Sequence, residues 1–250
     1  MLNNFFCKSP YINLYDLPSY NSKIGSQILY GEKFKILKKK KKFFKIRTAY
    51  DNYIGYIKSK KHLTRFVGTH KVSVLKARIF KYPINSKKFE SNVFLSFSSK
   101  IQILKKKKKF IMFDKNKWLC TKDVKLIKQK DKNIIKILKL FLNCKYKWGG
   151  KSYNGIDCSA LIQMFYKFNN KFFPRDTVDQ IKFKKGTIAK KKFKPGDIIY
   201  WKGHVAICVN SKELIHAYGP RKKVLIMPIK KTIKLIKDTA NLEVKKIFSI

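Results

Sequence analysis

The stretch YNGIDCSALIQMFYKF, residues 153–168, places Cys158 directly after an aspartate and at the head of an apolar run. Leu161, Phe165 and Phe168 follow at spacings of three and four, which predicts a helix with one apolar stripe. A cysteine among apolar residues is commonly a small buried hydrophobic residue. A helix N-terminus, however, favours negative charge and lowers the pKa of a thiol. The stretch alone therefore leaves two roles open for Cys158, a core residue or a nucleophile.

The chain is strongly basic. Of its 250 residues, 60 are Lys or Arg and 14 are Asp or Glu, which gives a formal net charge of +46. Such a charge first suggests a nucleic-acid partner. Only five of the 60 are arginine, however. Arginine is the side chain whose guanidinium forms bidentate hydrogen bonds with bases and phosphates. We interpret the lysines as a solvated basic surface with weak adhesion to polyanions, and we predict no specific nucleic-acid partner.

Targeting segments and cysteine usage bear on the compartment. Residues 1–20 lack a cationic start followed by an apolar core, and no run of 18 apolar residues occurs, so we expect no signal peptide and no transmembrane segment. The five cysteines are widely spaced and contain no C-x-x-C pair, which argues against disulfides and structural zinc. We expect a cytoplasmic protein without metal or other cofactor, with periplasmic export as the alternative. The oligomeric state stays open.

The first half of the chain contains a repeat. The octapeptide ILKKKKKF occurs at residues 36–43 and again at 103–110. Short alternating apolar segments, broken by clusters of Pro, Ser and Asn, flank each copy and predict strands and turns. We therefore expect two small β-rich units, with the lysine runs 38–42 and 105–109 as solvated hairpin tips.

The pattern of apolar residues changes at Asp131 from strand-like alternation to helical spacing. Residues 131–144 have helical apolar spacing, and a second helix is predicted from Cys158 after a glycine-rich break. Residues 193–219, FKPGDIIYWKGHVAICVNSKELIHAYG, then divide into three short strands at Pro-Gly, Lys-Gly and Asn-Ser. Helices followed by an antiparallel sheet define an α+β domain.

Two histidines fall in this domain. His204 and His216 lie on successive predicted strands, and a hairpin turn at Asn210–Lys212 would place Ala206 opposite His216. Because strand side chains alternate faces, His204 becomes a diagonal neighbour of His216. A thiol nucleophile needs a base and a group that orients the base. With Asp157 or one of its neighbours as the helix cap, we predict a triad of Cys158 as nucleophile, His204 as base and His216 as its orienting partner.

Sequence motifs at these positions resemble a known family. Five motifs occur in order between residues 146 and 219: YKWGG, NGIDCSALIQ, FPRDTVDQ, KPGDIIYWKGHVAICV and LIHAYG. Together they are similar to the motifs of the NlpC/P60 family of cysteine peptidases. Residues 13–57 resemble a bacterial SH3-like (SH3b) domain, and residues 72–127 do so more loosely. The resemblance implies a papain-like catalytic domain at 129–250, preceded by two small all-β SH3-like barrels at 1–66 and 67–128.

The family motifs also imply roles for single residues. Cys158, His204 and His216 match the catalytic positions, and Ala160 stands where the family often has glycine. The substrate-binding positions implied by the match are Tyr146, Asp157, Ser159, Arg175, Asp176 and Thr177.

The resemblance implies hydrolysis of the γ-D-glutamyl–meso-diaminopimelate bond in peptidoglycan-derived peptides. Asp157 could pair with the free amine of an L-Ala-γ-D-Glu end, which would make the protein a dipeptidyl-peptidase acting on freed peptides. One alternative is a cell-wall-binding SH3b protein whose papain-like domain is inactive. Another is an amidase or acyltransferase that uses the same triad. A polyanion-binding protein would instead show salt-sensitive nucleic-acid binding.

Overall fold

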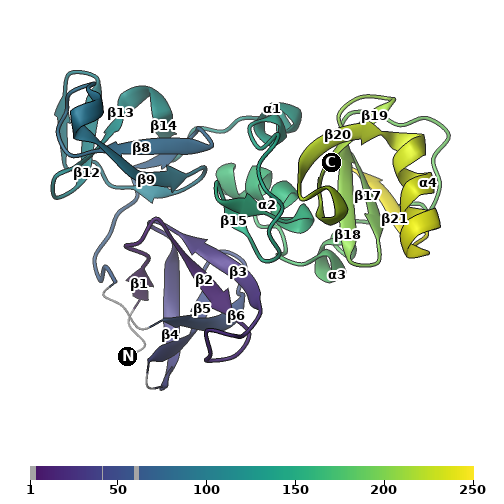
Figure 1. The fold of residues 1–250 in the computed structure, drawn as a ribbon, viewed down its shortest axis with the longest axis horizontal. Helices are drawn as coiled ribbons and strands as arrows, with labels where there is room; N and C mark the ends of the chain where they lie inside the picture. The colour runs from purple at the N-terminus through teal and green to yellow at the C-terminus, as the bar shows by residue number, and fades with distance from the viewer. Residues whose placement is uncertain (1–3, 41, 59–61) are drawn as a thin grey trace. The chain divides into compact units, whose positions relative to one another are not determined.

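The structure of the protein, a computed structural model, describes residues 4–40, 42–58 and 62–250. It divides into two compact units (Figure 1). The first comprises Met1–Lys130 together with Lys151–Tyr153, and the second comprises Asp131–Gly150 and Asn154–Ile250. The division therefore falls two residues beyond the predicted boundary at 128, and the boundary at 66 stays a prediction.

The first unit is built of strands, as the alternating pattern predicts. One six-stranded sheet has the order β1-β4-β5-β6-β2-β3, a second sheet has the order β10-β7-β14, and a third has the order β11-β12-β13-β8-β9. The strands are β1 Asn4–Phe6, β2 Tyr11–Tyr15, β3 Ile24–Leu29, β4 Lys33–Lys40, β5 Phe43–Thr48, β6 Ile54–Lys58, β7 His70–Val72, β8 Lys76–Phe80, β9 Glu90–Ser96, β10 Lys100–Ile101, β11 Lys105–Lys107, β12 Phe110–Asp114, β13 Lys117–Cys120 and β14 Val124–Leu126, with short 3-10 turns at Lys87–Phe89 and Thr121–Asp123.

Apolar clusters stabilise these sheets, and the two largest of them are separate. Leu14, Ile28 and Phe34 belong to the cluster under the first sheet. Val72 and Leu119 belong to the cluster formed by the later strands. Two cores in one β-rich unit agree with two small barrel-like parts, each of which buries one face of its strands.

Both lysine runs lie on hairpins, β4–β5 and β11–β12. The described lysines of both runs are exposed, as expected of solvated positions. The prediction was wrong in one respect, because the strands β4 and β11 continue through the first three lysines of each run. Consecutive lysines are compatible with these strands because their side chains are exposed to solvent. On β11, which is an edge strand, the charge also disfavours pairing with another chain. Lys41 lies outside the described residues.

The segment Lys151–Tyr153 packs within the first unit. The Lys151 backbone N–H donates to Gln27 Oε1 at 2.8 Å. Lys151 Nζ lies 3.5 Å from Asp51 Oδ2, and both side chains are fully buried. The Tyr153 ring contacts Tyr11 and Phe94 edge-on. This placement was not predicted, because it depends on partners more than 50 residues away in the chain.

The second unit has the predicted α+β architecture. Its antiparallel sheet has the order β20-β19-β18-β17-β21. The helices are α1 Ile134–Lys139, α2 Cys158–Phe168, α3 Thr177–Gln180 and α4 Ile229–Ala240, and the sheet strands are β17 Asp197–Trp201, β18 His204–Cys208, β19 Glu213–Tyr218, β20 Lys223–Pro228 and β21 Lys246–Ser249. The short strand β16 Gly155–Ile156 precedes α2, and a 3-10 turn, Gly219–Arg221, precedes β20, whereas the short strand β15 Lys151–Ser152 belongs to the first unit. The helices at 134 and 158 and the three predicted strands are confirmed.

Helices α2 and α4 cover different faces of this sheet. Ile199, Trp201 and Ala206 pack with residues of α4 in one apolar cluster. Tyr200, which alternates with Ile199 and Trp201 along β17, lies close enough to Tyr166 of α2 for the two phenols to interact electrostatically. The sheet is therefore buried on both sides, and α2 becomes a central helix.

The single apolar stripe predicted for α2 was wrong. Every residue of α2 except Phe165 is buried, and Phe165 was expected on the buried stripe. Contacts with α1, β18 and β19 enclose the helix on several sides, which leaves no solvated face. Polar residues on the remaining faces find partners inside the unit; Gln163 Nε2, for example, donates to the Phe173 carbonyl at 3.0 Å.

Candidate active site

Cys158 is the first residue of α2, and Asp157 is its N-cap, as predicted. Asp157 Oδ1 accepts a hydrogen bond from the Ala160 N–H at 2.8 Å, which satisfies one of the free N–H groups of the first turn. The side chain of Cys158 is buried, with 7% exposure. The thiol thus lies at the positive end of the helix dipole in a site that largely excludes water.

The Asp157 carboxylate is the centre of a buried network. Besides the Ala160 N–H, its oxygens accept from Ser159 Oγ at 3.0 Å, from the Gly149 N–H at 2.9 Å and from both terminal nitrogens of Arg175. Arg175 Nη1 also donates to Ser159 Oγ at 2.8 Å. Three predicted substrate-binding residues, Asp157, Ser159 and Arg175, are therefore joined directly beside Cys158.

This network bears on the expected pairing of Asp157 with a substrate amine. Five donors of the protein occupy the carboxylate, about as many as its lone pairs can accept. A substrate ammonium group would have to displace one of them. The substrate-binding role of Asp157 stays a prediction, and the observed role is to hold the start of α2.

The two histidines meet as the register predicts. Ile207 pairs with Ile215 and Cys208 pairs with Leu214, so the same register places Ala206 opposite His216. His204 Nε2 lies 3.0 Å from His216 Nδ1. His216 is fully buried, whereas His204, at the start of β18, is half-buried. The diagonal contact is confirmed, while the catalytic roles of Cys158, His204 and His216 stay predictions.

The sequence did not indicate a further partner of His216. His216 Nε2 lies 3.3 Å from Met227 Sδ, on the neighbouring strand β20. Because a thioether accepts but does not donate, the tautomer of His216 that satisfies both contacts donates from Nε2 to the sulfur and accepts at Nδ1. His204 then donates from Nε2 to His216, which leaves His204 Nδ1 as the basic nitrogen. In this arrangement the contact with Met227 favours one tautomer for each ring.

Replacing Met227 by leucine should test this arrangement. The volume changes little, but the buried Nε2–H of His216 loses its acceptor. We expect kcat to fall several-fold, about 1 kcal/mol in the barrier, with KM nearly unchanged. The measurement is steady-state hydrolysis of a free peptide across pH. A Met227→Leu profile identical to that of the parent would contradict the assignment, and Met164→Leu in α2 serves as the matched control.

Burial sets the protonation states of the site. It raises the pKa of the Cys158 thiol to about 12, and Asp157 adds to the rise, against the smaller effects of backbone hydrogen bonds from Val205 and Ser159 and of the Arg175 charge. Burial likewise lowers the pKa of His204 to about 4 and that of His216 to about 3. The prediction of a lowered thiol pKa was therefore wrong, because desolvation outweighs the helix N-terminus. Thiol and imidazole are both neutral at pH 7.

Stability should fall in acid because of the two histidines. Their pKa values in the folded state lie below the ordinary 6.5, so the unfolded chain binds more protons as pH falls from about 6.5 towards 4. Their contribution is complete above pH 6.5 and is lost through that window, by at most about 1.4 kcal/mol per pH unit for each ring. Urea unfolding from pH 7.5 to 4.5 measures it. His216→Asn should flatten the slope; equal slopes in both proteins would contradict the lowered pKa values.

Tyr146 lies beside the thiol. Burial raises the pKa of Tyr146 well above its ordinary value, and the nearby Cys158 and Asp157 add to the rise. Tyr146 also lines a depression of about 540 Å³ together with His204 and Tyr218. A phenol that keeps its proton in this position can donate a hydrogen bond to a substrate oxygen next to the nucleophile.

The remaining predicted residues lie at the start of α3. Asp176 is the N-cap residue of α3 and Thr177 its first helical residue, and both are half-buried. Asp176 Oδ1 lies 3.9 Å from Arg175 Nη1, which connects this turn to the network around Asp157. Their contact with substrate stays a prediction.

Two further findings concern the described residues as a whole. Within residues 4–40, 42–58 and 62–250, no three His, Cys, Asp or Glu side chains are grouped so that they could hold a metal ion. No helix in the same part of the chain is both long and apolar enough to cross a bilayer.

A thiol at a helix start, packed against an antiparallel sheet that presents an imidazole pair, defines a papain-like α+β hydrolase of the cysteine type. Comparison with known families agrees. Residues 143–238 match the NlpC/P60 family, and residues 14–61 match the bacterial dipeptidyl-peptidase SH3 domain. The chain therefore contains a cysteine-peptidase domain of the NlpC/P60 family, preceded by a bacterial SH3 domain, and the predicted fold class and family are confirmed.

Individual relatives and structures support the same assignment. The chain is 27% identical over 233 residues, 84% of its length, to the gamma-D-glutamyl-L-lysine dipeptidyl-peptidase of Bacillus subtilis, of which 77% is covered. It is 34% identical over 87 residues, 34% of its length, to dipeptidyl-peptidase 6 of Lysinibacillus sphaericus, of which 31% is covered. The crystal structure of an NlpC/P60 family protein from Bacillus cereus matches its fold with a TM-score of 0.77 at 19% identity, over 91% of this chain and 94% of that one.

Proposed function

We propose that the protein hydrolyses the γ-D-glutamyl–meso-diaminopimelate bond of free peptidoglycan-derived peptides and releases the dipeptide L-Ala-γ-D-Glu, in the cytoplasm. The observation that carries the proposal is the His204–His216 contact of 3.0 Å, in the same unit as a thiol at the start of α2. The names of two relatives, both dipeptidyl-peptidases, support release of a dipeptide.

The reaction begins with proton transfer. His204 Nδ1 accepts the Cys158 proton while Sγ attacks the γ-carbonyl carbon of D-glutamate. The C–N bond then breaks, and the imidazolium returns the proton to the departing amine of the diamino acid. A thioester of L-Ala-γ-D-Glu with Cys158 remains. Water, deprotonated by His204, hydrolyses it and regenerates the thiol.

The pKa values favour this order of events over a preformed ion pair. With the pKa of Cys158 at about 12 and that of His204 at about 4, a thiolate–imidazolium pair is rare in the free enzyme. The thiol therefore loses its proton as it attacks, and His204 acts as a general base. His216 supports the imidazolium that forms, since its Nδ1 accepts from His204 Nε2.

The positions around the thiol support recognition of the substrate. The Tyr146 hydroxyl is suited to donate to the oxyanion of the tetrahedral intermediate. The Arg175 guanidinium is paired with the Asp157 carboxylate beside the nucleophile, so its part in this proposal is to hold the start of α2 in place for substrate binding. Asp176 and Thr177, on the adjoining turn, extend the binding surface in this proposal.

The identity of the diamino acid is tested separately, because one relative is named for L-lysine. The test therefore compares L-Ala-γ-D-Glu-meso-diaminopimelate with L-Ala-γ-D-Glu-L-Lys, each with a free amine and as its N-acetyl derivative, by mass spectrometry of the released dipeptide. We expect cleavage of the meso-diaminopimelate peptide and loss of cleavage on N-acetylation.

Other outcomes separate the parts of the proposal. Faster cleavage of the lysine peptide would overturn the choice of diamino acid only. Equal cleavage of acetylated peptides, or efficient digestion of intact murein sacculi, would overturn the dipeptidyl-peptidase specificity and with it the proposed place in the cytoplasm.

A further inference from the structure

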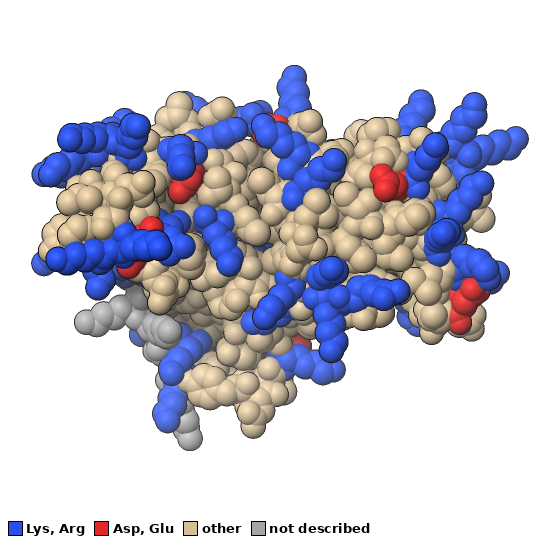
Figure 2. Space-filling view, turned by 45° about the horizontal axis from the view of Figure 1, so that its top comes forward, with Lys and Arg blue, Asp and Glu red and all other residues tan. Residues whose placement is uncertain are grey.

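Lysine alone does not mark a binding site on this protein. Lysine and arginine side chains are distributed over the whole visible face in Figure 2, with few acidic side chains among them. A net charge of +46 makes any depression on the surface basic at its edge. A candidate site therefore needs a second property that the general surface lacks.

One groove of the second unit has such a property, an apolar floor. It has a volume of about 1260 Å³ and lies at the end of β18 opposite His204, since the β18–β19 turn with Ser211 and Lys212 contributes to it. Phe193, Ile229 and Ile233 contribute apolar side chains, and the floor is completed by Ile188, Val244 and Ile247. Ordinary small-molecule sites occupy roughly 300–1,000 Å³, so the groove suits a larger occupant.

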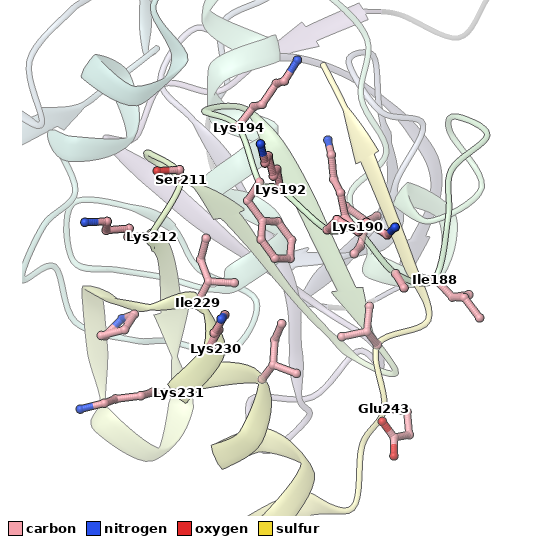
Figure 3. Close-up of a pocket in the computed structure, with 17 residues that line it drawn as sticks. Ile188, Lys190, Lys192, Lys194, Ser211, Lys212, Ile229, Lys230, Lys231 and Glu243 are labelled. Atoms are coloured by element: carbon pink, nitrogen blue, oxygen red, sulfur yellow. The ribbon is translucent and has the colours of Figure 1, made fainter.

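Lysines border this floor from more than one side (Figure 3). Lys190, Lys192 and Lys194 come from the loop before β17, whereas Lys212, Lys230 and Lys231 come from the β18–β19 turn and from α4, and Ile229 lies between the two groups. We call these six residues, with Lys191, the lysine rim.

The rim is not neutralised by the protein itself. Lys190 pairs with Asp197 at 2.6 Å, and Glu243, the acidic residue of the groove, is engaged by Lys237 at 2.9 Å. For the other rim lysines, the described part of the chain supplies no ion pair. Such a cluster of like charges is unfavourable until an anionic partner arrives.

The start of α4 adds to this imbalance. Its first turn contains Lys230 and Lys231 and no acidic residue, and its N-cap, Pro228, makes no side-chain hydrogen bond to the helix. Cations at a helix N-terminus oppose the helix dipole. A carboxylate that entered the groove here would therefore stabilise both the lysines and the helix end.

We propose that the groove binds an acidic amphipathic helix of a partner protein. The apolar stripe of such a helix would lie on the floor, and glutamates on its two flanks would reach the two groups of rim lysines, the helix-in-groove mode of recognition. A single lipid carries one head group and cannot match charges on both sides. A second copy of this chain is repelled by its own +46 charge.

The test uses two synthetic peptides in fluorescence anisotropy with the full-length protein at 150 mM salt. One peptide has leucines at i, i+3, i+4 and i+7 flanked by glutamates, and the other is a scramble of the same composition. We expect the ordered peptide to bind at least about tenfold tighter than the scramble, because only it presents an apolar stripe to the floor.

Matched variants locate the site. The triple charge reversal Lys192→Glu, Lys230→Glu, Lys231→Glu should weaken binding about tenfold or more. The reversal of residues 105, 106 and 107, which changes the net charge equally on the exposed strand β11, should change binding less than about twofold. Ile188→Ser, at a side chain that is 74% exposed and whose loss should not affect folding, should weaken the ordered peptide and leave the scramble unchanged.

Three results would overturn the proposal: equal binding of the two peptides, equal effects of the two triple reversals, or rim-dependent binding of anionic vesicles or single-stranded DNA without binding of the ordered peptide. None of the substituted residues belongs to the proposed active site, so peptide hydrolysis should persist in every variant. The experiments can therefore refute peptide binding in the groove without refuting the proposed hydrolysis, and they can refute the proposed hydrolysis without refuting peptide binding.

Discussion

Replacing Cys158 by serine should reduce kcat/KM for the free tripeptide by on the order of 10⁴-fold or more. A serine hydroxyl is far less acidic than a thiol, and a base with a pKa of about 4 cannot deprotonate it effectively. The substitution changes one atom at a helix start that Asp157 continues to cap, so the fold should persist. The measurement is dipeptide release over time, with circular dichroism as the check on folding.

The other cysteines supply the controls for this experiment. Cys144 and Cys208 are buried in the same unit, so Cys144→Ser and Cys208→Ser carry a comparable packing cost without touching the nucleophile. Both should retain turnover within about tenfold of the parent, since only stability is affected. Loss of activity in Cys208→Ser together with retention in Cys158→Ser would move the nucleophile from helix α2 to strand β18 and refute the site.

The second large effect concerns stability. Arg175→Met should lower the free energy of unfolding of the second unit by about 3–5 kcal/mol, because it leaves the buried Asp157 carboxylate without its cation. The guanidinium also donates to Ser159 Oγ, so the loss extends to the first turn of α2. Urea unfolding of the parent and of the variant measures the difference.

Two variants identify the cause of that loss. Arg221→Met, in an exposed turn, removes the same charge and should cost less than about 0.5 kcal/mol. The double variant Asp157→Asn, Arg175→Met should regain part of the lost stability, because no unpaired buried charge remains. A double variant less stable than Arg175→Met alone would show that the ion pair is not the source.

The imidazole pair and the start of α2 were predictable from sequence for a simple reason. The side-chain period of a strand is two, and the turn sets the register of a hairpin, so a turn at Asn210–Lys212 was enough to predict His204 and His216 as diagonal neighbours. An aspartate one residue before an apolar-periodic run likewise specifies a cap by local chemistry.

The parts that the sequence did not reveal depend on burial and on distant partners. The thiol pKa rises because α2 is enclosed on several sides, and local sequence does not report the depth of burial. Met227 reaches His216 only through the pairing of β19 with β20, and β20 lies in a lysine-rich segment without a clear alternating pattern. The partner of Asp157, Arg175, was recognised as a motif residue but not as a member of an ion pair.

The measurement that tests the central claim most directly is affinity labelling. An L-Ala-γ-D-Glu derivative whose γ-carboxyl is converted to an acyloxymethyl ketone carries the proposed dipeptide and an electrophile that traps a nucleophilic sulfur as a thioether. Intact-protein and peptide mass spectrometry should find one label per chain, on Cys158, in parallel with loss of peptide hydrolysis, and His204→Gln should slow the labelling. A label on Cys144 or Cys208, or full activity in protein labelled at Cys158, would contradict the account.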